Sequence, residues 1–209
     1  MPIYHKLGKV PAKRHTIFEK PNGDLHYEQL FGTIGFDGMS SLMYHLHRPT
    51  MVKEVGQSID LSPKIAIEKN IKSLKFIGFN VPPQDDFLAS RTPLLVNGDI
   101  HIGVAAPKQS MTDYFYKNAD ADEMLFIHQG SGTLKTLMGN ISFEYGDYLI
   151  IPRGMIYQLA FDGPENRILY AESFHPIYPQ AIPQLVWSTV RAFAFLRAGL
   201  QAARDFRNP

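Results

Sequence analysis

The sequence contains no cysteine, which excludes disulfide bonds, thiolate nucleophiles and cysteine-ligated metal centres. It also has no apolar run of 18 residues, and its N-terminus MPIYHKLGKV has no apolar signal region, so neither a membrane span nor a secretion signal is expected. Neither charge is in excess, because 21 Lys and Arg stand against 20 Asp and Glu. This balance predicts no nucleic-acid and no membrane partner. We therefore expect a cytoplasmic protein.

The 209 residues suffice for one domain with a buried core and appended segments. Aromatic residues make up 12% of the chain, which is consistent with the packed faces of a β-barrel and with a homo-oligomer interface. We expect a homo-oligomer on this ground.

Short β-rich runs separated by Gly, Asn and Asp turns dominate the stretch from Asp113 to Ala160. Such turns often require positive φ angles, which these residue types tolerate best, and they join antiparallel strands. The runs are residues 123–128, 133–137, 141–145 and 148–151. Four strands within fifty residues predict a small antiparallel barrel or sandwich.

The spacing in this stretch resembles the cupin family. Glu123 stands seven residues before Gly130, and Gly146-Asp147, Pro152 and Gly154 follow the spacing of the second cupin motif. The resemblance implies a mainly β fold, a cupin-like antiparallel barrel or jelly roll. We expect it to carry an N-terminal β-rich arm and one or two short helices.

Three positions depart from the metal-binding cupin pattern. Lys117, Ala119 and Tyr157 stand where that pattern has histidines. Mononuclear iron needs at least two imidazoles and a carboxylate, so Glu123 alone cannot hold it. We expect a metal-free barrel without cofactor or catalytic residue. Glu123 and Tyr157 would form a vestigial pocket, either holding a small ligand or closed by a hydrogen bond between them.

The N-terminal arm contains two further patterns. Residues 21–24, Pro-Asn-Gly-Asp, predict a turn between two short strands. Residues 41–47 predict a strand on which His45 and His47 share one face. This pair is the alternative metal site, although His-x-His on a strand is usually structural and no acidic third ligand lies nearby.

Residues 62–74 predict a helix, because Pro63 suits the first helical position. Its buried stripe would contain Ile65, Ile67, Ile71 and Leu74. Residues 94–96 and 100–104 predict a hairpin around the turn Asn97-Gly98-Asp99. On this hairpin His101 is expected at the rim, and His128 is expected to face outward because it is out of phase with Glu123.

A closer resemblance covers residues 2–178. The stretches that carry it are YHKLGKVP, KRHT, LFGT, RTPLL and DYFYKNADADE, in this order. They resemble the N-terminal part of bacterial homogentisate 1,2-dioxygenases. That resemblance implies two barrels in tandem, with an iron triad of two histidines and a glutamate in the second barrel. The family uses Fe(II) and O₂ to open the ring of homogentisate, a step of tyrosine catabolism, and forms hexamers built from trimers.

The resemblance assigns residues 1–93 to an N-terminal arm, 94–178 to a degenerate cupin barrel and 179–209 to an atypical tail. The iron ligands lie outside this chain, so we expect it to be inactive alone. A small aromatic substrate would bind only together with the missing C-terminal domain. The alternatives are a non-catalytic binding or assembly module and an independent cupin enzyme that uses His45, His47 and Glu123.

The tail departs from the family from Gln180 onward. A DNA string that encodes a family-like segment, KRYRNWFGQLFEHSPFCERDF, also encodes residues 180–200 of this chain when it is read in a shifted frame. The hypothesis is therefore a frameshifted tail, and the alternative is an apolar helix from Pro183 to Ala203.

Overall fold

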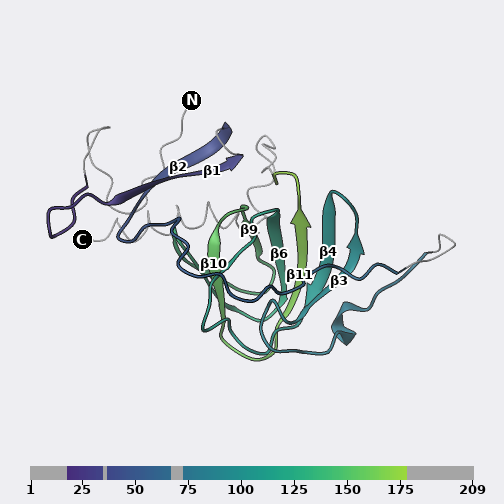
Figure 1. Ribbon diagram of the computed structural model, residues 1–209. Coiled ribbons are helices and arrows are strands. Elements are labelled where there is room, and N and C mark those ends of the chain that lie inside the picture. The colour runs from purple at the N-terminus through teal and green to yellow at the C-terminus, as the bar shows by residue number, and fades with distance from the viewer. Residues whose placement is uncertain (1–17, 35–36, 67–72, 178–209) are drawn as a thin grey trace, which may run out of the picture. The chain divides into compact units, whose positions relative to one another are not determined.

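The computed structural model describes residues 18–34, 37–66 and 73–177 (Figure 1). The chain divides into two compact units with a boundary between Ser62 and Pro63. Each unit is considered by itself below. In the described part of the chain no helix is long and apolar enough to cross a bilayer.

The first unit is an antiparallel hairpin. Strand β1 (Tyr27–Ile34) pairs with β2 (Asp37–His45), and the register shifts between Gly32 and Ile34. Before β1, Glu19 forms an isolated bridge with Leu25 around the predicted turn. Gly23 has a φ of 85° there, a conformation that glycine adopts without steric cost.

The second unit is a jelly roll of two antiparallel sheets, which confirms the predicted fold class. The five-stranded sheet has the order β3-β4-β11-β6-β9, and Figure 1 shows these strands side by side. Its members are β3 (Arg91–Val96), β4 (Ile100–Ala105), β11 (Arg167–Ser173), β6 (Asp122–Gln129) and β9 (Tyr148–Ile151).

The four-stranded sheet has the order β5-β10-β7-β8. Its members are β5 (Tyr116–Lys117), β10 (Ile156–Phe161), β7 (Gly132–Thr136) and β8 (Gly139–Phe143). Strands β4, β6, β7 and β9 agree to within one residue with the runs that the sequence predicts, and β8 lies two residues before its run. Strands β5, β10 and β11 were not predicted. Strand β3 begins at Arg91, three residues before the predicted hairpin strand.

The core lies between the two sheets. Period-two alternation buries every second side chain of β6, beginning with Glu123. Apolar side chains that are almost fully buried contribute roughly 1.5–3 kcal/mol each. They include Phe87, Leu125, Ile127, Leu134, Leu159 and Ile168.

One turn glycine shows why the strand ends where it does. Gly130 follows β6 with a φ of 100°. A Cβ at this position would collide with the side chain of Asn166, whose Nδ2 donates hydrogen bonds to the carbonyls of Pro107 (3.0 Å) and Gly163 (2.7 Å). Both the backbone conformation and the available space therefore require glycine.

The predicted helix is not supported by the residues that flank its centre. Residues 63–66 and 73–77 form no helix, and Ile65 and Leu74 are 74% and 61% exposed instead of buried. Ile67 and Ile71 lie outside the described residues. The only helical element of the described chain is the 3-10 turn η1 (Gly78–Asn80). Proline at a first helical position permits a helix but does not supply the packing that stabilises one.

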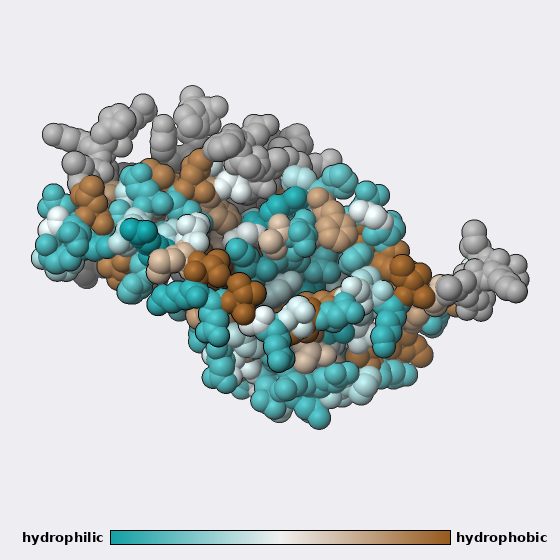
Figure 2. Space-filling view, in the orientation of Figure 1, coloured by the Kyte–Doolittle hydropathy of each residue, from teal (hydrophilic) through white to brown (hydrophobic). Residues whose placement is uncertain are grey.

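Apolar side chains are exposed along the connection between β2 and the barrel. In the view of Figure 2, the described surface is largely hydrophilic, with separate hydrophobic areas. Exposed apolar residues of the connection include Leu46, Met51, Val52, Val55, Ile59 and Leu61.

Candidate functional site

Glu123 and Tyr157 meet in the interior of the barrel. Glu123 is on β6 of the five-stranded sheet, and Tyr157 is on β10 of the four-stranded sheet. The Tyr157 hydroxyl donates a hydrogen bond of 2.7 Å to Glu123 Oε2, and both side chains are buried. The two residues singled out from the cupin motifs thus link the two sheets.

Arg91, which sequence analysis did not assign to the site, is the centre of this cluster. Its Nη2 lies 3.1 Å from Glu123 Oε1 and 3.0 Å from Glu172 Oε1. The contact with Glu123 is an ion pair without the alignment of a hydrogen bond. Arg91 is on β3, and Glu172 is on β11, directly opposite Glu123 in the sheet.

Aromatic rings surround the guanidinium. The Arg91 Cζ lies 4.3 Å from the centroid of the Tyr170 ring and 5.3 Å from that of Phe87. These distances are in the range of cation–π interactions. The ring of Tyr116 packs edge-on against Tyr157, with 5.5 Å between the centroids.

Glu172 has two further partners. Asn118 Nδ2 donates a hydrogen bond of 2.9 Å to its Oε1, and His101 Nδ1 lies 3.6 Å from its Oε2. His101 also packs edge-on against Phe174. Its side chain is 21% exposed. Glu172 therefore connects the buried pair of Arg91 and Glu123 to the rim of the barrel.

Burial and charge set the protonation of the cluster. Burial alone would lower the pKa of Arg91, but Glu123 and Glu172 more than offset this effect, so its pKa is raised and it stays charged. Burial raises the pKa of Glu123, although Arg91 and the Tyr157 hydroxyl counteract this. Burial also raises the pKa of Tyr157 well above its ordinary value, and that of Tyr116 to about 12. Both phenols are therefore neutral at pH 7.

The raised pKa of Glu123 predicts a pH dependence of stability. At pH values between 4.5, the ordinary pKa of a glutamate, and the raised pKa of Glu123, the folded state binds a proton at Glu123 more tightly than the unfolded state does. The contribution of Glu123 to stability is therefore present below pH 4.5 and is lost as pH rises through the folded pKa. We expect Glu123→Gln to remove this decline. The free energy of unfolding of the variant, minus that of the natural protein, should therefore increase with pH.

Urea denaturation at a series of pH values above 4.5 measures this difference. Glu54→Gln is the matched control, because Glu54 is exposed and should leave the pH profile unchanged. If the free energy of unfolding changes with pH in the same way for Glu123→Gln and the natural protein, burial does not set the pKa of Glu123.

Two of the three histidine positions of the cupin pattern, those that hold Lys117 and Ala119, face solvent in this barrel. Lys117 and Ala119 are exposed, whereas the adjacent Tyr116 and Asn118 contribute to the cluster. Sequence analysis missed Tyr116 and Asn118. The sequence offered no usable signal for them, because β5 is only two residues long and gives too short a pattern to read.

His45 and His47 do not share a strand, because β2 ends at His45 and His47 follows it, exposed. The prediction of a strand through residue 47 was wrong here. His45 Nε2 instead lies 2.8 Å from Gln29 Oε1, a cross-strand hydrogen bond within the hairpin. Glu123 belongs to the other unit.

His128 is on the outward-facing register of β6, as expected, and its ring contacts Phe126 and Tyr145.

The residues beside Glu123 do not fit an iron site. The position next to its carboxylate is taken by the Arg91 guanidinium, and His101 is the only imidazole in the described cluster. Across residues 18–34, 37–66 and 73–177, no group of three or more His, Asp or Glu side chains could hold a metal ion. Two imidazoles and a carboxylate facing one open position are therefore not present together in this part of the chain.

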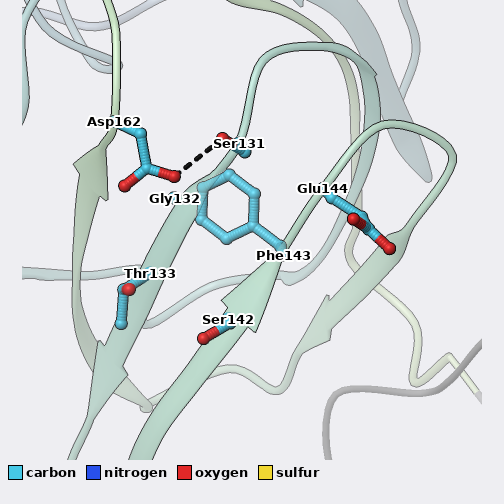
Figure 3. A pocket seen from close by; sticks show the side chains of 7 residues that line it. All are labelled: Ser131, Gly132, Thr133, Ser142, Phe143, Glu144 and Asp162. Atoms are coloured by element: carbon cyan, nitrogen blue, oxygen red, sulfur yellow. Dashed lines mark hydrogen bonds between the residues drawn. The ribbon is translucent and has the colours of Figure 1, made fainter.

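A pocket of about 380 Å³ lies at the other end of β6 from Glu123 (Figure 3). At its edge the Ser131 hydroxyl donates a hydrogen bond of 2.7 Å to Asp162 Oδ2. The lining is polar and open, unlike the mostly apolar sites that enclose small ligands. Its residues are Ser131, Gly132, Thr133, Ser142, Phe143, Glu144 and Asp162.

Two solved structures have partial similarity to this chain. One is a cupin-2 domain protein from Shewanella frigidimarina, with 19% identity, a TM-score of 0.39, and coverage of 46% of this chain and 87% of that one. Another is a protein with a double-stranded β-helix domain from Klebsiella pneumoniae, with 14% identity, a TM-score of 0.42, and coverage of 49% and 90%.

Two curated relatives have names that include a dioxygenase activity. A Saccharolobus solfataricus protein, named as a proposed dioxygenase, is 35% identical over 161 residues, which is 77% of this chain and 42% of the relative. The homogentisate 1,2-dioxygenase of Rhodopseudomonas palustris is 32% identical over 116 residues, 52% of this chain and 26% of that enzyme. The chain thus spans less than half the length of these relatives.

The family described as homogentisate 1,2-dioxygenase N-terminal matches residues 41–209. This range includes residues 180–209, which were expected from the sequence to depart from the family. The tail lies outside the described residues, so the frameshift stays a prediction that the nucleotide sequence of the gene tests. The match covers most of the chain, and the barrel between β3 and β11 lies entirely inside it. The chain therefore belongs to the family of homogentisate 1,2-dioxygenase N-terminal domains.

Proposed function

We propose that this chain is the metal-free N-terminal barrel of a homogentisate 1,2-dioxygenase-like protein and has no ring-cleaving activity by itself. The observation that carries the proposal is the Arg91 guanidinium, which lies 3.1 Å from Glu123 inside the barrel. A cation already pairs with the one carboxylate of the cupin motif. In the full-length family, Fe(II) would supply oxygen activation from a different domain.

Within such a protein the barrel acts as a rigid structural domain. The buried cluster joins the two sheets through Glu123 and Tyr157, and joins β3 to β11 through Arg91 and Glu172. A buried cluster of hydrogen bonds and ion pairs of this kind favours one arrangement of its strands. Substrate contacts and the open metal position would come from sequence beyond this barrel.

Oxygen consumption tests the proposal. The purified chain, given Fe(II) and homogentisate under air, should consume oxygen no faster than a blank without protein. The homogentisate 1,2-dioxygenase of Rhodopseudomonas palustris serves as the positive control under the same conditions. Turnover that requires stoichiometric iron and disappears in Glu123→Gln would contradict the proposal.

A second role, as an assembly module, is favoured by the outer face of the five-stranded sheet. Two cross-strand rows of almost wholly apolar residues run across all five strands there. Sheets that are apolar on both faces are normally covered on both. One row is Leu95, Ile102, Ala171, Met124 and Ile150, and the other is Thr92, Val104, Leu169, Phe126 and Tyr148.

The covering partner in this role is a second copy of the chain. Light scattering after size-exclusion chromatography should then give a dimer or a larger oligomer. Leu95 and Leu169 are 56% and 37% exposed, and replacing both with lysine should shift the protein toward the monomer. Leu137→Lys is the control, because Leu137 is 41% exposed but follows β7 of the other sheet. A monomeric natural protein would rule out this role.

A further inference from the structure

The guanidinium of Arg91 is enclosed by groups that normally surround a bound cation. Two carboxylates contact its Nη2, Glu123 at 3.1 Å and Glu172 at 3.0 Å. The ring of Tyr170 lies over its Cζ, with 4.3 Å to the centroid. The Arg91 side chain is only 11% exposed. A buried charge of this kind is tolerated because its partners are fixed around it.

The charges of the cluster require a cation in this position. Glu123 and Glu172 face each other across β6 and β11, and the phenol of Tyr157 is neutral. Without Arg91, two carboxylates would share one largely buried site without a positive charge. Such an arrangement is the environment in which proteins bind divalent ions through oxygen ligands.

We propose that Arg91 is the resident cation of this barrel and occupies the position between Glu123 and Glu172 that a divalent ion would otherwise take. The site consequently excludes metal while Arg91 is present and accepts a divalent ion when the guanidinium is removed. This inference rests on the metal-free barrel of the proposed function and deepens it, but its test measures occupancy of the site and not turnover.

The donors that would remain after removal of the guanidinium are mainly oxygens. They are the carboxylates of Glu123 and Glu172, the hydroxyl of Tyr157 and, at the rim, the imidazole of His101, 3.6 Å from Glu172. Carboxylate-rich sites with a single imidazole suit Mn²⁺ better than soft, thiolate-preferring metals. Mn²⁺ is therefore the probe of choice, since its free aquo ion gives an electron paramagnetic resonance signal that binding suppresses.

The test is a titration with Mn²⁺ of the natural chain, Arg91→Ala, Arg91→Lys and the double variant Arg91→Ala/Glu123→Gln. Arg91→Ala should bind one Mn²⁺ per chain, and the double variant should bind it at least about tenfold more weakly. The natural chain and Arg91→Lys, which keeps a cation in the site, should bind none there. If Arg91→Ala folds only with metal, circular dichroism should show folding that depends on Mn²⁺.

Three results would overturn the inference. One is stoichiometric Mn²⁺ binding by the natural chain that Glu123→Gln abolishes. Another is a folded Arg91→Ala variant that binds no Mn²⁺. The third is an Arg91→Ala variant that stays unfolded both with and without Mn²⁺. Mn²⁺ binding by the natural chain would also contradict the metal-free barrel of the proposed function. The other two results would overturn this inference alone, and oxygen consumption decides separately whether the chain has ring-cleaving activity.

Discussion

Arg91→Met should lower the free energy of unfolding by about 3–5 kcal/mol, the range for removing one partner of a buried ion pair. Methionine has nearly the length of the arginine side chain, so packing is largely kept and the charge is lost. Glu123, which is 1% exposed, then keeps the neutral side chains of Tyr157 and Asn118 as partners but no cation. Because Glu172 is 18% exposed and can regain water, we expect the lower end of the range. Urea denaturation monitored by circular dichroism measures the loss.

Two further variants separate charge from other effects. Lys53→Met is the control, because Lys53 is exposed and its loss should change stability by no more than about 0.5 kcal/mol. Adding Glu123→Gln to Arg91→Met should recover part of the loss, since it removes one of the uncompensated carboxylates. If Arg91→Met is as stable as the natural protein, the ion pairs do not hold the cluster together.

Gly103→Ala is expected to cost about 2–3 kcal/mol through overpacking of the barrel wall. Gly103 is on β4, opposite Tyr170 of β11. A Cβ there would lie well under 3.0 Å from the Tyr170 hydroxyl and from the backbone carbonyl of Thr92. The carbonyl cannot move without disturbing the pairing of β3 with β4. Movement of the Tyr170 ring would in turn remove the aromatic face over Arg91.

Gly98→Ala is the matched control in the turn of the same hairpin. A Cβ at Gly98 has no atom within 4 Å and its backbone is not in the left-handed region, so this variant should unfold at nearly the same urea concentration as the natural protein. Near-ultraviolet circular dichroism should show a changed tyrosine environment for Gly103→Ala alone. Equal stability of the two alanine variants would mean that the hairpin yields easily at Gly103.

The strands were predictable because their patterns are local. Alternation along residues 123–128, with turns at Gly130 and Gly146, identified β6 and its neighbours and placed Glu123 inward. The resemblance to the cupin motifs, and not the alternation, brought Tyr157 to Glu123, since both residues stand at motif positions. The hydrogen bond between them is present in the structure.

The centre of the site was not predictable in this way. Arg91 meets Glu123 and Glu172 only through the register of four strands, β3, β4, β11 and β6, which span residues 91–173 of the sequence. That register includes irregularities at Pro93/Leu95 and at Arg167/Ile168, which no local pattern specifies. A buried arginine also has no signature in composition, because most arginines are exposed. Arg91 belonged to the stretch RTPLL that resembles the family, but its role required the structure.

The position of β11 has a consequence for the order in which the protein folds during synthesis. This last strand of the barrel pairs with β4 on one side and β6 on the other, so it alone joins the β3–β4 hairpin to the β6–β9 pair. A nascent chain that ends before Arg167 can form both halves of the sheet but cannot connect them. Glu172 also completes the partners of Arg91 only at this stage. Until residues 167–173 have left the ribosome, the unpaired backbone edges of β4 and β6 stay open and can pair with other chains or bind chaperones.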